Sequence, residues 1–176
     1  MKCNKHTPLY VIGHAEHGKT TVARCLAGML NCTYADSSLW MADRVVRPWL
    51  AKRFDVHYDS VEEAHRDRHK WRAEWQEAIA DFNAEDPAKL SREIFFDNRI
   101  YCGCRTLREF EAGQKEFGAV AVFVEAYDRH GGIERGLEIA PSHCDVVLNN
   151  NEDWYYTIAR IHSFINNYNL LGVHTR

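Results

Sequence analysis

The sequence predicts an α/β domain, in which a parallel sheet is covered by helices on both faces. Short apolar runs alternate along the chain with segments of helical spacing, and this alternation implies crossover connections between parallel strands. The run at 119–126, AVAVFVEA, is continuous and β-branched, as in a strand that is buried on both faces. The run at 8–13, PLYVIG, ends in glycine shortly before a helical segment.

The same patterns place five strands and three of the helices. We expect the strands at 8–13, 33–35, 99–104, 119–126 and 144–148. We expect helices after the first, third and fifth strands, at 19–30, 106–117 and 153–170. In the second of these helices Thr106 is the predicted N-cap, and Glu109 occupies the capping-box position three residues later. A polar, glycine-containing loop at 127–141 joins the fourth and fifth strands.

A helical insert, residues 37–97, is expected between the second and third strands. Its first helix, at 38–54, should kink or break at Pro48, because proline cannot donate a backbone hydrogen bond. Its last helix is short and starts at Asp86, with Pro87 in the first helical position.

The central helix of the insert has two distinct faces. It begins at the N-cap Ser60, with Glu63 in the capping-box position, and continues to about residue 83. One face is apolar and includes Trp71 and Trp75, which we interpret as core residues. The opposite face is basic and carries Arg66, Arg68, His69, Lys70 and Arg72.

The composition is that of a soluble globular protein, with 45% hydrophobic and 27% charged residues. A net charge of −3 argues against a chain-wide basic field for nucleic acid, although a local basic patch is compatible with it. No stretch approaches ~18 consecutive apolar residues, so we expect no membrane span. The short polar start does not resemble a signal peptide. We therefore expect one cytoplasmic domain over residues 1–176.

Six cysteines occur, and most of them fall in apolar segments. In a cytoplasmic protein such thiols are expected to be reduced and buried. Cys3 with His6, or Cys102 with Cys104, are conceivable metal ligands. Neither pair has the C-x-x-C spacing of a zinc site, so we do not expect a structural metal.

Residues 13–20, GHAEHGKT, match the pattern G-x-x-x-x-G-K-[ST] between a predicted strand and a predicted helix. Glycines allow the backbone to wrap so that successive N–H groups point at one anion, and the helix adds its N-terminal dipole. Lys19 would neutralise phosphate charge, and the Thr20 hydroxyl would bind Mg²⁺. The pattern predicts a P-loop that binds ATP through Gly13, His14, Ala15, Glu16, His17, Gly18, Lys19, Thr20 and Thr21.

The interior of this loop is bulky, with His14, Glu16 and His17. We expect all three side chains to face solvent, because a carboxylate beside phosphates is repulsive. The alternative is that His17 carries charge near the phosphates, since histidine can be protonated near neutral pH.

Ligands of parallel sheets bind at the carboxyl ends of the strands. Those ends are Gly13, Asp36, Arg105, Glu125 and Asn149. With the P-loop, the insert and the end of the third strand at Gly103, Cys104 and Arg105, the chain resembles the nucleoside and nucleotide kinase branch of P-loop proteins. Phage-type deoxynucleoside monophosphate kinases are the nearest comparison. The resemblance implies a three-layer fold with sheet order 2-3-1-4-5, an insert that binds the phosphate acceptor, and a short lid at 127–141.

The resemblance also implies roles for individual residues. Asp36 would orient or deprotonate an acceptor hydroxyl, or else simply cap the next helix. Arg105 would grip the acceptor phosphate or the transferred group, and Arg129 or Arg135 in the lid would clamp the transferred group. Acceptor-binding candidates on the insert are Arg44, Arg68 and Arg72. Many relatives end the third strand with an acid near Mg²⁺. This chain has none there, so Asp36 or Glu125 would have to substitute.

The predicted function is in-line phosphoryl transfer from ATP with Mg²⁺ to a nucleotide acceptor, first of all a deoxynucleoside monophosphate. The alternative acceptor is a modified base in DNA, as for phage 5-hydroxymethyluracil DNA kinases. A further alternative is a nucleotide-binding protein without catalysis. The chain lacks the N-K-x-D signature of regulatory GTPases and the strand ending in Asp-Glu of helicase ATPases.

Overall fold

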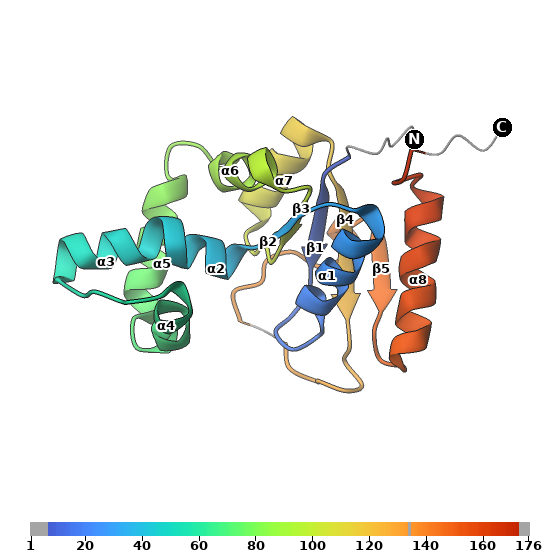
Figure 1. Ribbon diagram of the computed structural model, residues 1–176, viewed down its shortest axis with the longest axis horizontal. Helices are drawn as coiled ribbons and strands as arrows, with labels where there is room; N and C mark the ends of the chain where they lie inside the picture. Colours follow the sequence, from blue (N-terminus) through green and yellow to red (C-terminus); the bar gives the residue numbers. More distant parts are fainter. Residues whose placement is uncertain (1–6, 134, 173–176) are drawn as a thin grey trace.

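The computed structural model describes residues 7–133 and 135–172 and forms one five-stranded sheet with helices on both faces (Figure 1). Neighbouring strands are parallel, and their order is β2-β3-β1-β4-β5. The strands are β1 Leu9–Ile12, β2 Tyr34–Asp36, β3 Ile100–Cys102, β4 Val120–Glu125 and β5 Val146–Asn149. The predicted fold class and strand order are confirmed. Within the described residues, no helix is long and apolar enough to cross a membrane.

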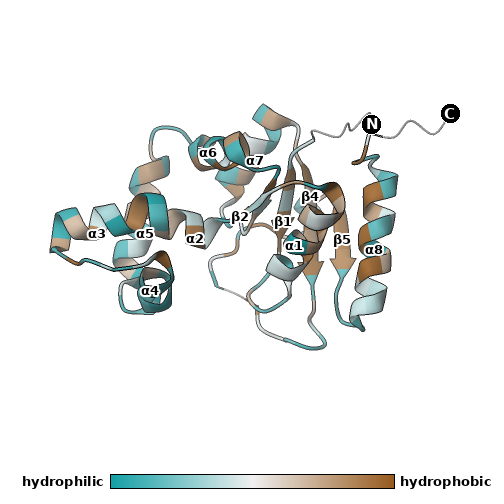
Figure 2. Cartoon of the chain, in the orientation of Figure 1, coloured by the Kyte–Doolittle hydropathy of each residue, from teal (hydrophilic) through white to brown (hydrophobic). Residues whose placement is uncertain are grey.

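Alternate residues of β1 enter two separate apolar cores, as expected for a strand covered on both faces. Leu9 and Val11 pack with α1 (Lys19–Leu30) and α8 (Trp154–Asn167). Tyr10 and Ile12 pack on the opposite face with α6 (Lys89–Asp97) and α7 (Leu107–Phe117). The strands are accordingly apolar along most of their length (Figure 2).

The insert between β2 and β3 projects away from the sheet as a helical arm, residues 37–83 (Figure 1). The arm contains α2 (Ser37–Met41), a π-helical stretch (Ala42–Val46), α3 (Arg47–Phe54), α4 (Val61–Arg66), a 3₁₀ turn (Asp67–His69) and α5 (Arg72–Asn83). It has a small core of its own, formed by Ala42, Val46, Leu50, Trp75 and Ala78.

Two predictions for the arm need correction. The helix does not break at Pro48, since α3 continues directly from the π-helical stretch Ala42–Val46, whose wider turn lies just before the proline. The helix that begins at Ser60 is not continuous, although Ser60 does cap it by accepting from the Glu63 N–H. It breaks around residues 67–71, where Lys70 donates from both its N–H and its ammonium group to Asp67.

The predicted capping box of α7 is also wrong. The Thr106 side chain makes no capping hydrogen bond, and Glu138 accepts from the Leu107 N–H instead (2.9 Å). Glu109 is buried, because its carboxylate turns inward to accept from the Tyr101 hydroxyl (2.6 Å).

Candidate functional site

The P-loop, residues 13–20, connects β1 to α1 at the carboxyl edge of the sheet. Gly13 has φ 154°, and a Cβ atom there would lie 2.4 Å from the Val124 carbonyl oxygen. Gly18 has φ 88°, and a Cβ atom there would lie 2.4 Å from Asn150 Nδ2. Both positions therefore require glycine, by conformation and by close approach. Gly18 directly precedes the twelve-residue helix α1, whose N-terminus favours an anion.

Lys19 and Thr20 begin α1 and are partly accessible. The Lys19 ammonium group donates to the His14 carbonyl oxygen (3.2 Å), which holds its charge beside the loop. The Thr20 hydroxyl donates to Asp36 Oδ2 (3.2 Å). The P-loop and the end of β2 are thereby in direct contact.

The expectation that all three bulky side chains face solvent is wrong for the two histidines. Glu16 is exposed, whereas His14 and His17 are buried at 7% and 0% exposure. His17 Nδ1 accepts from the Ala126 N–H (3.1 Å), and Nε2 lies 2.8 Å from the His130 carbonyl oxygen. Because a carbonyl only accepts, the proton is assigned to Nε2 and Nδ1 carries none. His17 thus ties the P-loop to the segment after β4, and this bonding leaves it uncharged.

Asn150 forms a second buried connection between the P-loop and the rest of the domain, and little in the sequence indicates it. Its Nδ2 donates to the His17 carbonyl oxygen (2.9 Å), and its Oδ1 accepts from the Thr157 hydroxyl (2.8 Å). Its place directly after β5, at the edge where ligands bind, is the one signal that could have suggested it.

The sequence leaves two roles open for Asp36, and the geometry is compatible with both. Asp36 caps α2, since Oδ1 accepts from the Ser38 N–H (3.0 Å) and from the Ser38 hydroxyl (2.6 Å). Oδ2 faces Thr20. Carboxylate and hydroxyl oxygens are hard donors that suit Mg²⁺ together with phosphate oxygens, so the pair fits the ion that accompanies ATP. Within the described residues, no group of three or more acidic, histidine or cysteine side chains could hold a metal ion by itself.

Cys102 ends β3, a strand whose end carries no acid. Its Sγ lies 4.0 Å from the Thr20 hydroxyl oxygen. Burial, with the nearby negative charge of Asp36, raises the pKa of Cys102 to about 12. The thiol is therefore protonated at neutral pH. Burial also raises the pKa of Cys104 well above its usual value. The other conceivable metal pair, Cys3 with His6, lies outside the described residues.

The loop after β4 crosses the carboxyl edge of the sheet. Arg105, exposed after β3, receives the Glu138 N–H on its carbonyl oxygen (2.9 Å), so this loop reaches the end of β3. Arg129 is exposed in the same loop and borders a hollow of about 460 Å³ together with Trp154 and Tyr156 from the start of α8. Arg135 is exposed farther along the loop.

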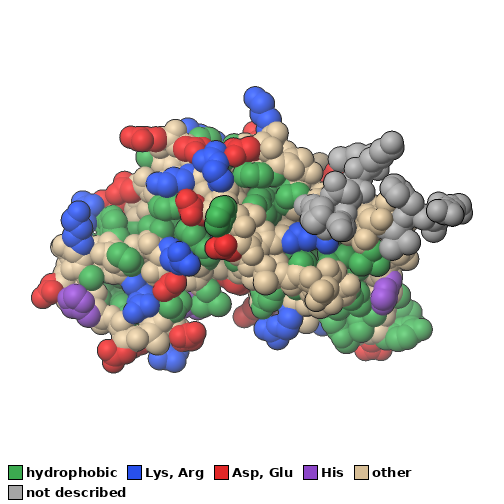
Figure 3. Space-filling model, turned by 45° about the horizontal axis from the view of Figure 1, so that its top comes forward, with side chains coloured by type: hydrophobic (Ala, Val, Ile, Leu, Met, Phe, Trp, Pro, Cys, Tyr) green, Lys and Arg blue, Asp and Glu red, His purple; other side chains and the backbone are tan. Residues whose placement is uncertain are grey.

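The arginines predicted for the acceptor lie on the arm and are exposed, but their surroundings are not uniformly basic. Arg44 forms an ion pair with Asp43 (3.3 Å), and Arg68 lies against His65 (3.1 Å). Arg72 is the first residue of α5. Acidic and basic side chains are interspersed over the face of the arm in view (Figure 3).

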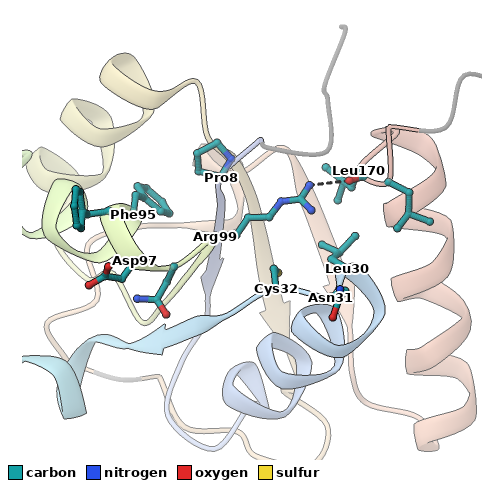
Figure 4. Close-up of a pocket in the computed structure, with 11 residues that line it drawn as sticks. Pro8, Leu30, Asn31, Cys32, Phe95, Asp97, Arg99 and Leu170 are labelled. Carbon is teal, nitrogen blue, oxygen red and sulfur yellow. Dashed lines mark hydrogen bonds between the residues drawn. The ribbon is translucent and has the colours of Figure 1, made fainter.

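A separate hollow of about 530 Å³ lies at the amino ends of the strands (Figure 4). Pro8, Cys32 and Arg99, which line it, lie just before β1, β2 and β3. Arg99 donates to the backbone carbonyls of Thr7 (3.1 Å) and Leu170 (2.8 Å), which bridges the ends of the domain. The hollow is at the opposite edge of the sheet from the P-loop, so it takes no part in phosphate binding.

The chain matches no protein-family model and no curated protein sequence. It is similar to the unliganded structure of a sugar kinase from Janibacter sp. HTCC2649, with a TM-score of 0.51 and 15% identity over 96% of this chain and 99% of that chain. Shikimate kinase from Aquifex aeolicus vf5 gives a TM-score of 0.48 and 16% identity, over 95% of this chain and 100% of that chain. The similarity to the sugar kinase shows that the two proteins share a fold.

Proposed function

We propose that this protein is an ATP-dependent kinase whose preferred acceptor is a (deoxy)nucleoside monophosphate. The observation that carries the proposal is the contact between Thr20 of the P-loop and the Asp36 carboxylate at the end of β2. It brings a phosphate-binding loop and an acid of the acceptor side together at the edge of the sheet where ligands bind. The shared fold with a sugar kinase supports phosphoryl transfer as the reaction class.

On the donor side, the N–H groups of residues 13–20 and the N-terminus of α1 would hold the phosphates of ATP, and Lys19 would neutralise their charge. Thr20 and Asp36 would hold Mg²⁺, which when bound neutralises charge on the transferred phosphoryl group. The hollow beside Arg129, Trp154 and Tyr156 offers aromatic and cationic surface for the base.

On the acceptor side, Arg105 would bind the acceptor phosphate and Asp36 would orient the attacking oxygen. The exposed Arg44, Arg68 and Arg72 would attract the acceptor to the arm. Arg129 would stabilise the charge of the transferred group from the loop after β4. Catalysis by positioning and charge neutralisation is what phosphoryl transfer requires of a protein.

A hydroxymethylated base in DNA is the second candidate acceptor. The half-buried Asp36 carboxylate can take a proton from an acceptor hydroxyl, which a phosphate acceptor does not require. The exposed cations at Arg66, Arg68, Lys70 and Arg72 can contact a DNA backbone. Acidic side chains lie among these cations, and Asp67 pairs with Lys70 at 2.7 Å. They reduce the attraction of this surface for a DNA backbone, so we rank this acceptor second.

Labelled ATP with separate sets of nucleoside monophosphates, hydroxymethylated DNA and free sugars tests the proposal. Label should pass to monophosphates. Lys19→Ala should abolish transfer, whereas Lys115→Ala, which removes an exposed lysine of α7, should leave it unchanged. Transfer at the wild-type rate by Lys19→Ala would contradict the role of the P-loop. ATP binding without transfer to any acceptor would instead indicate a non-catalytic nucleotide-binding protein.

A further inference from the structure

His65 reaches the phosphate site through one intervening residue. Its Nε2 atom lies 2.9 Å from the Ser38 hydroxyl oxygen, and that hydroxyl lies 2.6 Å from Asp36 Oδ1. A carboxylate can only accept, so the single hydroxyl proton of Ser38 is donated to Asp36. The remaining contact of Ser38 must then be a donation from His65, which places a proton on Nε2.

Arg68 lies on the other side of the imidazole ring. Its Nη1 atom is 3.1 Å from each ring nitrogen of His65 and can only donate. At equal distance from both nitrogens, Nη1 lies over the face of the ring, outside the in-plane direction of either nitrogen, and it donates to the His65 carbonyl oxygen (3.1 Å). Burial, and secondarily the charge of Arg68, lower the pKa of His65. The hydrogen bonds therefore run in one direction, from His65 to Ser38 and from Ser38 to Asp36, to which Thr20 also donates.

This chain of hydrogen bonds crosses between two helices of the arm. Ser38 belongs to α2, which leads directly out of β2, whereas His65 belongs to α4, which returns later in the chain to lie against α2. With His65 donating to it, the Ser38 hydroxyl is held toward Asp36 Oδ1, so Oδ2 faces Thr20. Moving α4 away would release the hydroxyl and loosen Asp36.

We propose that His65 is a positioning residue that, through Ser38, orients Asp36 for Mg²⁺-bound ATP and so makes the phosphate site depend on the docking of α4 against α2. The inference rests on the proposed function, because it assigns Asp36 to the nucleotide-bound ion. Neighbours of metal-binding side chains commonly change metal affinity by about 10- to 100-fold when they are replaced.

The test measures how much Mg²⁺ strengthens binding of a fluorescent ATP analogue, as the ratio of its Kd in EDTA to its Kd in Mg²⁺. His65→Leu removes the donor and should lower this ratio about tenfold, with the Kd in EDTA unchanged. His65→Gln retains an N–H at the end of its side chain and should restore most of the ratio. His69→Leu, at an exposed histidine of the same region, should match the wild type.

Asp36→Asn and the double variant Asp36→Asn with His65→Leu complete a double-mutant cycle. If His65 acts through Asp36, the double variant should lose no more than Asp36→Asn alone. In the unmutated protein, ¹⁵N chemical shifts of the His65 ring should show the proton on Nε2, a readout that needs no substitution.

The outcomes separate the inference from the proposed function. If His65→Leu gains as much affinity from Mg²⁺ as the wild type, or loses affinity equally in EDTA and in Mg²⁺, the inference is overturned and the kinase proposal stands. A proton found on Nδ1 alone overturns it as well. If the wild-type protein binds no nucleotide in either condition, the proposed function itself is wrong.

Discussion

Glu109 is a carboxyl group buried between α7 and the sheet, with hydroxyl groups as its hydrogen-bond partners. It is 5% exposed and accepts from Tyr101 (2.6 Å) and Ser91 (3.4 Å), and Ser91 in turn accepts from Tyr10 (2.7 Å). Burial raises the pKa of Glu109 from 4.5 to about 7, and the hydrogen bonds from Tyr101 and Ser91 oppose this only in part. Its ionisation should therefore contribute to the pH dependence of stability.

The direction in which pH changes the free energy of unfolding follows from which state binds the proton. Between pH 4.5 and about pH 7 the folded protein holds a proton on Glu109 that the unfolded chain has lost, so the free energy of unfolding falls as pH rises. The stabilising contribution is fully present below 4.5 and fully lost above about 7. The gap between these values corresponds to about 3 kcal/mol. Glu109→Gln keeps an oxygen that can accept from Tyr101 and removes the titration.

The assay is urea unfolding of both proteins at several pH values between about 5 and 8. The wild type should lose stability across this range by about 2.5 kcal/mol more than Glu109→Gln, which should be the more stable protein at the alkaline end. Glu111→Gln, at an exposed position of the same helix, should follow the wild type. If wild type and Glu109→Gln differ by the same amount at every pH, Glu109 does not titrate in the folded protein as argued.

Two further predictions concern the P-loop. Gly18→Ala should weaken binding of an ATP analogue at least tenfold in a titration, because its Cβ would displace Asn150. The control Gly28→Ala has open space around its Cβ, so it should leave binding unchanged. It should also stabilise α1 by about 0.5–1 kcal/mol in thermal unfolding. His17→Leu should destabilise the fold by about 1–3 kcal/mol, since the buried Ala126 N–H and the partly buried His130 carbonyl group lose their partner. His162→Leu, at an exposed position, should not destabilise it, and equal unfolding midpoints for these two variants would refute the role of His17.

The strands could be predicted because a strand buried on both faces is visible as a local run of apolar residues. Their ends were less accurate. The third strand was expected at 99–104 but stops at Cys102, because Gly103 turns the chain with φ 97°. The break in the helix after Ser60 could not be predicted, since apolar residues at helical spacing lie on both sides of it. The burial of Glu109 could not be predicted either. Its position suggests a capping box, and nothing local in the sequence indicates that the Tyr101 hydroxyl lies close enough to donate to it.

The loop between β1 and α1 could be predicted because its motif, residues 13–20, is contiguous in the sequence. The hydrogen bonds that hold this loop could not be predicted, because the residues that form them are far apart in the sequence. His17 meets Ala126 across 109 positions, and Asn150 meets the His17 carbonyl across 133. Single-sequence patterns report spacing along a helix or strand, and they carry no record of which loops meet at the edge of a sheet.

Two residues of the P-loop, His17 and Thr20, are held by different parts of the sheet. His17 is bonded to Ala126 after β4 and to Asn150 after β5, while Thr20 donates to Asp36 of β2. Loosening the contacts of His17 should weaken nucleotide binding with or without Mg²⁺, because it displaces the N–H groups to which we assign the phosphates. Loosening Asp36 should leave the nucleotide bound and affect only steps that depend on Mg²⁺ or on the acceptor. Because Ser38 at the start of the arm donates to Asp36, changes in the arm should alter the Mg²⁺-dependent steps while the N–H groups of the P-loop keep their place.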